Sequence, residues 1–164
     1  MAFKEIFIIV ALAYVVGAAR VRNCGGTIRP YKLSFSPNAL RRNDRTLTVR
    51  GIVRIARSVR GSSFRYRVKI MKKGRDLCKH ELKRFCTGRV RCVDIANVLK
   101  GAKCRNGQLL RGTYNIDAVR RTLPGDFLTL LRLTSKGMYT FKALLSSERN
   151  TVIGCVEGEV RKIN

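Results

Sequence analysis

The 164-residue sequence has few acidic residues, a single histidine and no recognisable catalytic motif. Asp and Glu number 10 against 35 Lys and Arg, and the one histidine is His80. Neither Gly-x-Ser-x-Gly nor His-Glu-x-x-His occurs, so hydrolase chemistry is not expected. Asp76 and Glu81 lie near His80 in no known catalytic arrangement, and Glu157 and Glu159 are better explained as offsetting nearby arginines. We therefore expect neither an enzyme nor a bound cofactor.

Other absences narrow the class of protein further. After residue 16 no apolar run approaches the roughly 20 residues that a membrane-spanning helix needs. The cysteines show no Cys-x2-Cys spacing, and with one histidine no zinc site is expected. No repeat, low-complexity tract or proline-rich linker occurs, which favours a single domain. No Asn-x-Ser/Thr site occurs, so delivery to lysosomes through N-glycans has no support.

The first 19 residues are typical of a secretory signal peptide. Lys4 precedes an apolar stretch from Ile6 to Val16, and small residues follow up to Ala19. We expect cleavage near Ala19, a single domain over residues 20–164 and an extracellular location. An uncleaved membrane anchor is the alternative.

Six cysteines follow the expected cleavage point, and an even number in a secreted chain indicates three disulfides. From spacing alone, about fifteen pairings are open. Free buried cysteines are the alternative. The six are Cys24, Cys78, Cys86, Cys92, Cys104 and Cys155.

The net charge of +25 indicates an anionic partner. Solubility needs only about 2 to 8 charges in a small domain, and a larger excess strains a compact fold through self-repulsion. Arginine, the more frequent of the two basic residues, has a planar fork that suits phosphate, sulfate and carboxylate. The partner could be a membrane, a sulfated glycan, lipopolysaccharide or nucleic acid. Export and cysteine content argue against nucleic acid.

Alternating apolar and polar residues predict β-strands through most of the chain. The clearest run is 64–70, in which Phe64, Tyr66, Val68 and Ile70 alternate with basic residues only. Several short strands with turns about ten residues apart favour a β-sandwich. Further strands are expected in 45–60, 112–119, 126–145 and 150–163, a basic turn in 71–76 and a short helix in 92–100.

Five segments together resemble the ML-domain lipid-recognition family, and within it the ganglioside (sphingolipid) activators. The resemblance runs from Asn23 to the C-terminus. It implies an all-β, immunoglobulin-like sandwich that opens as a cup around a lipid's acyl chains, and a binding protein rather than an enzyme. The segments are NCGGTIRPYKLSFSPNAL, CKHELKRFC, CVDIANVLKGAKC, RGTYNID and GMYTFKALLSSERNTVIGCVEGEV.

The resemblance also implies the disulfide pairs and the lipid-facing residues. The pairs are Cys24 with Cys155, Cys78 with Cys86, and Cys92 with Cys104. The residues expected to include the cavity lining are Phe64, Tyr66, Val68, Ile70, Phe127, Leu131, Tyr139 and Phe141; ordinary core packing is the alternative for each. Relative to the ganglioside activators one bridge is missing, and their apolar rim loop corresponds here to the basic stretch MKKGRD.

Charge is therefore expected to replace an inserted apolar loop at the membrane. No acid occurs between residues 45 and 75, and strands 45–60 and 64–70 are expected to pair into one basic plate. The docking residues would be Arg50, Arg54, Arg65, Arg67, Lys69, Lys72, Lys73 and Arg75.

Two functions remain open at this point. The first is a secreted protein that binds or transfers a lipid, either a glycolipid or a phospholipid and most readily an anionic one such as lipid A. The second is a cationic binder of sulfated glycans or microbial surfaces, with a filled core.

Overall fold

The described part of the chain consists mostly of antiparallel β-strands, as the alternating sequence predicted. The computed structural model describes residues 20–36, 45–79, 83, 86–122 and 135–163. In this part of the chain no helix is long and apolar enough to cross a membrane. The predicted signal peptide, residues 1–19, lies outside it. The strands are β1 (Arg20–Gly26), β2 (Ile28–Ser36), β3 (Thr46–Ile55), β4 (Val59–Arg60), β5 (Ser63–Lys72), β6 (Arg75–Asp76), β7 (Thr87–Arg91), β8 (Cys104–Arg105), β9 (Gln108–Leu109), β10 (Gly112–Thr122), β11 (Gly137–Ser146) and β12 (Val152–Lys162).

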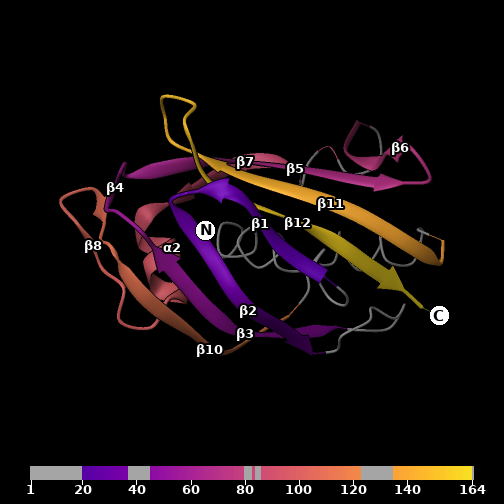
Figure 1. Cartoon of the computed structure of the whole chain (residues 1–164), viewed down its shortest axis with the longest axis horizontal. Coiled ribbons are helices and arrows are strands. Elements are labelled where there is room, and N and C mark those ends of the chain that lie inside the picture. The colour runs from indigo at the N-terminus through magenta and orange to yellow at the C-terminus, as the bar shows by residue number, and fades with distance from the viewer. Residues whose placement is uncertain (1–19, 37–44, 80–82, 84–85, 123–134, 164) are drawn as a thin grey trace.

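Two sheets form the sandwich. The first sheet has the order β1-β12-β11-β5-β6, with β7 also paired to β5, and the second has the order β10-β3-β2. A small end sheet, β4-β9-β8, lies with the helix α2 (Cys92–Val98) at one end of the sandwich, while the β5–β6 turn lies at the other (Figure 1). The short 3-10 helix η1 (Leu77–Lys79) follows β6. Only α2 among the described elements is an α-helix, and it falls within the predicted 92–100.

The chain crosses from the first sheet to the second at Thr27. The Thr27 amide donates to the Ile153 carbonyl on β12 at 2.8 Å, and the Thr27 carbonyl accepts from the Ala56 amide, after β3, at 3.0 Å. Gly26 precedes this crossing with a φ of +93°, and a Cβ there would lie 2.6 Å from the Ile153 carbonyl carbon. Only glycine fits so close to a neighbouring backbone in this conformation.

The predicted basic turn in 71–76 is a two-residue hairpin turn. Lys73 and Gly74 form it, and both have positive φ values, +47° and +79°. Two positive values are the requirement of a type I′ turn, whose twist matches that of the flanking strands. The turn aligns Lys72 of β5 with Arg75 of β6.

Three disulfides are present, and they are the pairs that the family resemblance implied. They are Cys24–Cys155, Cys78–Cys86 and Cys92–Cys104. Cys24 lies at a register shift of β1 against β12, so the first disulfide links two neighbouring strands from opposite ends of the chain. The third ties α2 to β8.

The expected pairing of strand 45–60 with strand 64–70 is wrong. β3 pairs with β2 and β10, whereas β5 pairs with β11, β7 and β6. The short connection between β3 and β5 contains β4, which pairs with β9 in the end sheet and carries the chain from one layer to the other. Alternation in the sequence predicts which side chains of a strand share a face, but it does not predict the partner of that strand. A short connection can either form a hairpin or carry the chain to the other sheet.

Removal of the Cys24–Cys155 disulfide should destabilise the protein more than removal of Cys78–Cys86. The sequence separations are 131 and 8 residues. In the chain-entropy model the longer closure contributes about 5 kcal/mol and the shorter about 2.5 kcal/mol. Urea unfolding of the two double Cys→Ala variants measures both losses. A larger loss for the short-loop variant would contradict the placement of the first disulfide.

Gly26→Ala should destabilise the sandwich by about 2 kcal/mol or more beyond Gly25→Ala. Both glycines have positive φ, so both substitutions introduce backbone strain, but a Cβ at Gly25 meets no atom within 4 Å. The pair therefore isolates the clash with Ile153. Thermal or urea unfolding of both variants measures the difference, and equal destabilisation would show that the close approach at Gly26 is not required.

Candidate functional site

The inner face of β5 carries the apolar residues predicted to line the interior. Phe64, Tyr66, Val68 and Ile70 are buried, and the residues between them are exposed. The ring of Tyr66 lies against Gly88 of β7, where a Cβ would come within 2.6 Å of the ring. Gly88 therefore leaves the space that the tyrosine occupies, and this contact was not predicted from the sequence.

Strand β11 extends this apolar surface. Register places Phe141 opposite Ile70 and Ala143 opposite Val68, and both β11 residues are buried. Tyr139, also buried, continues the same face toward the β5–β6 turn. The other two predicted lining residues, Phe127 and Leu131, lie outside the described residues, so their role remains a prediction.

The second sheet supplies the opposite wall. Val49, Val53 and Ile55 of β3 and Ile116 of β10 are buried and belong to the same apolar cluster as the inner face of β5. All four are aliphatic, whereas β5 and β11 contribute aromatic rings. Tyr114 of β10 also packs against this cluster, so both sheets contribute aromatic and aliphatic side chains to the interior.

The two ends of the interior are both buried but differ slightly in exposure. The largest wholly buried side chains gather where α2, β7 and β9 meet the start of β5, and they include Phe64, Val90 and Leu109. Along β5 the exposed fraction rises from 0% at Phe64 to 8% at Ile70, toward the β5–β6 turn. We call the end at α2 the closed end and the end at the turn the rim.

Lys72 lies at the rim and is held by several acceptors. Its ammonium donates to the carbonyls of Ser135 and Lys136 at 2.8 Å and to the Tyr139 hydroxyl at 2.9 Å. It also lies 4.6 Å from the centre of the Tyr139 ring, within cation–π range. The Tyr139 hydroxyl in turn donates to the Ser135 carbonyl. Lys72 therefore fixes the start of β11 against β5 and differs from the other predicted docking residues.

The remaining predicted docking residues are exposed, but they do not form one plate. Arg50 and Arg54 project from β3 in the second sheet, whereas the β5 residues project from the first. The expected plate is therefore divided between two sheets, because β3 and β5 do not pair with each other. Exposed in the first sheet or at its rim are Arg65, Arg67, Lys69, Lys73 and Arg75.

Two basic residues that were not predicted join those on the outer face of β5. Arg89 of β7 lies directly opposite Arg65, and Lys142 of β11 lies directly opposite Lys69. Both are exposed. The alternation of Arg89 and Arg91 around Val90 would have identified the first, but no local pattern indicates which strands lie beside β5.

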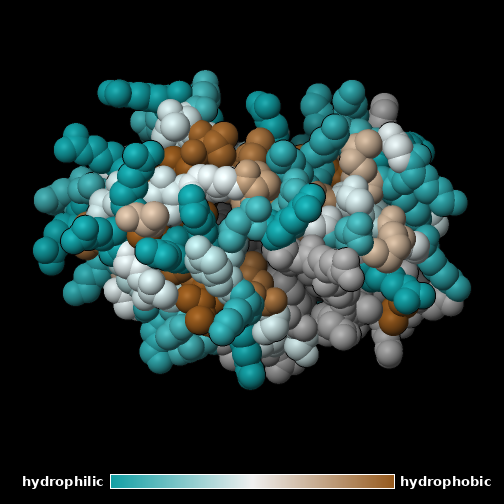
Figure 2. All heavy atoms as spheres, in the orientation of Figure 1, coloured by the Kyte–Doolittle hydropathy of each residue, from teal (hydrophilic) through white to brown (hydrophobic). Residues whose placement is uncertain are grey.

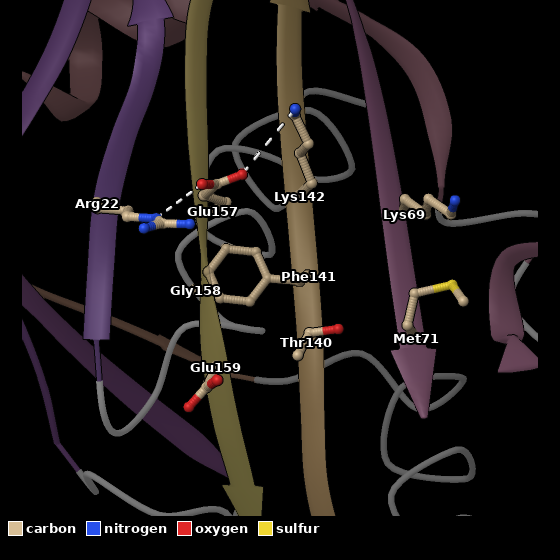
Figure 3. Close-up of a pocket in the computed structure, with 9 residues that line it drawn as sticks. All are labelled: Arg22, Lys69, Met71, Thr140, Phe141, Lys142, Glu157, Gly158 and Glu159. Atoms are coloured by element: carbon tan, nitrogen blue, oxygen red, sulfur yellow. Dashed lines mark hydrogen bonds and ion pairs between the residues drawn. The ribbon is translucent and has the colours of Figure 1, made fainter. Parts of the chain in front are cut away.

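A hollow of about 430 Å³ lies on this outer face beside Lys69 and Lys142 (Figure 3). Glu157 lies between two cations in it, 2.7 Å from Arg22 and 4.0 Å from Lys142. The contact with Arg22 agrees with the prediction that Glu157 offsets a nearby arginine. The lining residues are Arg22, Lys69, Met71, Thr140, Phe141, Lys142, Glu157, Gly158 and Glu159.

No group of three or more His, Cys, Asp or Glu residues that could hold a metal occurs in the described ranges. Asp94 of α2 is buried and receives two hydrogen bonds from the Arg91 guanidinium, at 2.8 and 2.9 Å. The Arg91 guanidinium thus supplies a hydrogen-bond donor to each oxygen of the buried carboxylate. The same pair connects the start of α2 to the end of β7.

No protein-family model matches the sequence, and no curated protein matches it. The Niemann-Pick type C2 protein from Japanese carpenter ant has a similar solved structure, with a TM-score of 0.51 at 10% identity over 88% of this chain and 100% of that chain. Chicken MD-1, solved in complex with lipid IVa, gives a TM-score of 0.44 at 11% identity over 87% of this chain and 96% of that chain. Neither structure is of a ganglioside activator, so that finer resemblance stays a prediction. The protein has the β-sandwich fold of the carpenter-ant protein.

Proposed function

We propose that this is a secreted lipid-binding protein that holds acyl chains between its two sheets and exchanges them with anionic membranes at the rim. The observation that carries the proposal is the continuous apolar face of β5 and β11. It runs from the wholly buried Phe64 at the closed end to Ile70 and Tyr139 at the rim. The sequence resemblance to the ML-domain family supports the same function. The proposal is one of binding, with no reaction catalysed.

Burial of an acyl chain would supply enough free energy without a dedicated headgroup site. Each methylene moved from water to an apolar surrounding contributes about 0.8 kcal/mol. Ten methylenes would then contribute roughly 8 kcal/mol before the entropy of binding is subtracted. The Lys72 ammonium and the Tyr139 hydroxyl lie where the headgroup of such a lipid would emerge.

The rim is the part of the surface suited to face a membrane, because a lipid must pass between the bilayer and the interior. Lys73 and Arg75 are exposed there, on either side of Gly74. A basic residue near an anionic surface contributes about 1 kcal/mol. Contact of this strength is reversible, as transfer requires.

Lipid extracted from the purified, secreted protein and identified by mass spectrometry tests the function directly. We expect one class of acyl lipid at close to stoichiometric amount. A protein that purifies without lipid and extracts none from liposomes would have a filled core, and the lipid-binding proposal would be rejected.

Phe141→Asp should abolish lipid extraction from liposomes, whereas Thr140→Asp should leave it nearly unchanged. The two residues are neighbours on β11, and one is buried while the other is exposed. A charge on the inner face would meet the acyl chain, and desolvating it costs several kcal/mol. Liposome extraction measured by fluorescent lipid partition compares the two variants.

Circular dichroism and disulfide mapping serve as the folding control for this comparison. Because Phe141→Asp could itself prevent folding, Ile70→Trp provides a second variant that fills the rim end of the interior without adding charge. A folded Phe141→Asp or Ile70→Trp protein that extracts lipid as well as the parent would show that this face packs as ordinary core.

Reversal of the rim charges, Lys73→Glu with Arg75→Glu, should weaken binding to phosphatidylserine vesicles. The loss should be about 2 kcal/mol or more in low salt, roughly 30-fold, and much smaller in high salt because salt screens exposed charges. Co-sedimentation at two salt concentrations measures it. Arg50→Glu with Arg54→Glu changes the same number of charges on the second sheet and is the matched control. An equal loss in that control would mean that net charge, and not the rim, directs docking.

A further inference from the structure

The outer face of the first sheet carries a band of cations that the lipid-binding function does not use. The basic band consists of Arg89 on β7, Arg65, Arg67 and Lys69 on β5, and Lys142 on β11. All five side chains are exposed. They lie on the face opposite the apolar interior, because alternate residues of β5 point to opposite sides of the sheet. Hydrophilic side chains also cover most of the described surface in the view of Figure 2.

Two pairs of like charges face each other directly within this band. Arg65 is the register partner of Arg89, and Lys69 is the register partner of Lys142. The Cβ atoms of such partners lie about 4.5–5.5 Å apart, and like charges in this position destabilise a sheet. An anionic group between Arg65 and Arg89 would remove this repulsion and accept charge-assisted hydrogen bonds from both. At the second pair, an anionic group on Lys69 and Lys142 would replace the 4.0 Å contact of Lys142 with Glu157, whose carboxylate keeps its 2.7 Å contact with Arg22.

The spacing of the two pairs suits an extended polyanion. Lys69 lies four positions after Arg65 on β5, which corresponds to about 13 Å along the strand. Arg67 lies midway on the same face. Arg65 uses one of its donors on the Asn150 side chain, at 3.2 Å, and a guanidinium has five donors. Three successive anionic groups along one chain could therefore be contacted.

The hollow at the Lys69 end of the band indicates what kind of polyanion this is. Besides cations it contains two carboxylates, Glu157 and Glu159, together with the Thr140 hydroxyl and Met71 (Figure 3). Glu159 forms no ion pair with any other described residue. Carboxylates repel phosphate and sulfate, but they accept hydrogen bonds from hydroxyl groups. A volume of about 430 Å³ admits a sugar ring, whereas a flat bilayer surface cannot enter it.

We propose that the basic band and the adjoining hollow bind a sulfated oligosaccharide, with sulfates on the cation pairs and a sugar ring in the hollow. Sulfate groups would lie between Arg65 and Arg89 and between Lys69 and Lys142. Glu159 and Thr140 would contact the hydroxyls of the sugar ring. This function is additional to lipid binding and does not depend on it, since the two sites lie on opposite faces of the first sheet.

A heparin-derived hexasaccharide is a suitable probe, with its affinity measured by isothermal titration calorimetry at two salt concentrations. Arg65→Ala with Arg89→Ala, and separately Lys69→Ala with Lys142→Ala, should each weaken binding at least about tenfold, because each removes two charge-assisted contacts. Arg50→Ala with Arg54→Ala removes the same charge from the second sheet, and we expect its affinity to stay within about threefold of the parent, since screening limits the effect of distant charges. An equal loss in this control would show binding by net charge and overturn the proposal.

The hollow is tested by Thr140→Trp, which should obstruct it without altering the charge. We expect this variant to lose affinity for the hexasaccharide but to bind inorganic polyphosphate as the parent does. An unchanged hexasaccharide affinity would overturn the placement of the sugar ring. If the two band variants lose binding to phosphatidylserine vesicles and retain the hexasaccharide, the band is a membrane surface and the proposal is wrong. Lipid extraction by the same variants should match that of the parent, so failure here is separable from failure of the lipid-binding function.

Discussion

The sandwich depends on the crossing at Thr27, where one residue is hydrogen-bonded to the first sheet and to the residue that follows β3. Its amide pairs with β12 in the first sheet and its carbonyl with the residue after β3, beside the second sheet. The Cys24–Cys155 disulfide lies next to this crossing and joins β1 to β12. With this edge fixed by covalent and backbone bonds, side chains set the spacing of the sheets elsewhere. The aromatic residues of β5 and β11 are part of this side-chain packing, since they belong to the buried apolar cluster between the sheets.

Local structure was predictable wherever a short pattern determines it. The alternation in 64–70 identified the buried and exposed residues of β5, because the side-chain period of a strand is two. The turn predicted in 71–76 is present, and it contains Gly74 at one of the two positive φ values that a type I′ turn requires. Even the number of disulfides followed from the cysteine count, although their pairing came from resemblance. These features involve neighbouring residues or covalent chemistry.

Long-range arrangement could not be predicted in the same way. The sequence separates Arg22 from Glu157 by 135 residues, yet they form an ion pair on adjacent strands. The neighbours of β5 proved to be β7 and β11, and this assignment decides that Arg89 and Lys142 face Arg65 and Lys69. Backbone hydrogen bonds can form between almost any two strands. The order of strands in the sheets is therefore selected by the burial of all their apolar side chains together. The hollow beside Glu157 exists only once that order is fixed.

The distribution of charge favours a partner over solubility alone. The surface of a soluble protein normally mixes positive and negative side chains. Part of the first sheet does so, since Arg22 on β1 lies opposite Glu157 on β12. On β5 it does not, and the repulsion between Arg65 and Arg89 is retained at a cost in stability. Alternate residues of this one strand serve two surfaces, the apolar interior and the basic band. The apolar face and the basic band share no residue, so a lipid inside and an anion outside would meet a common residue only at Phe141, which also lines the hollow.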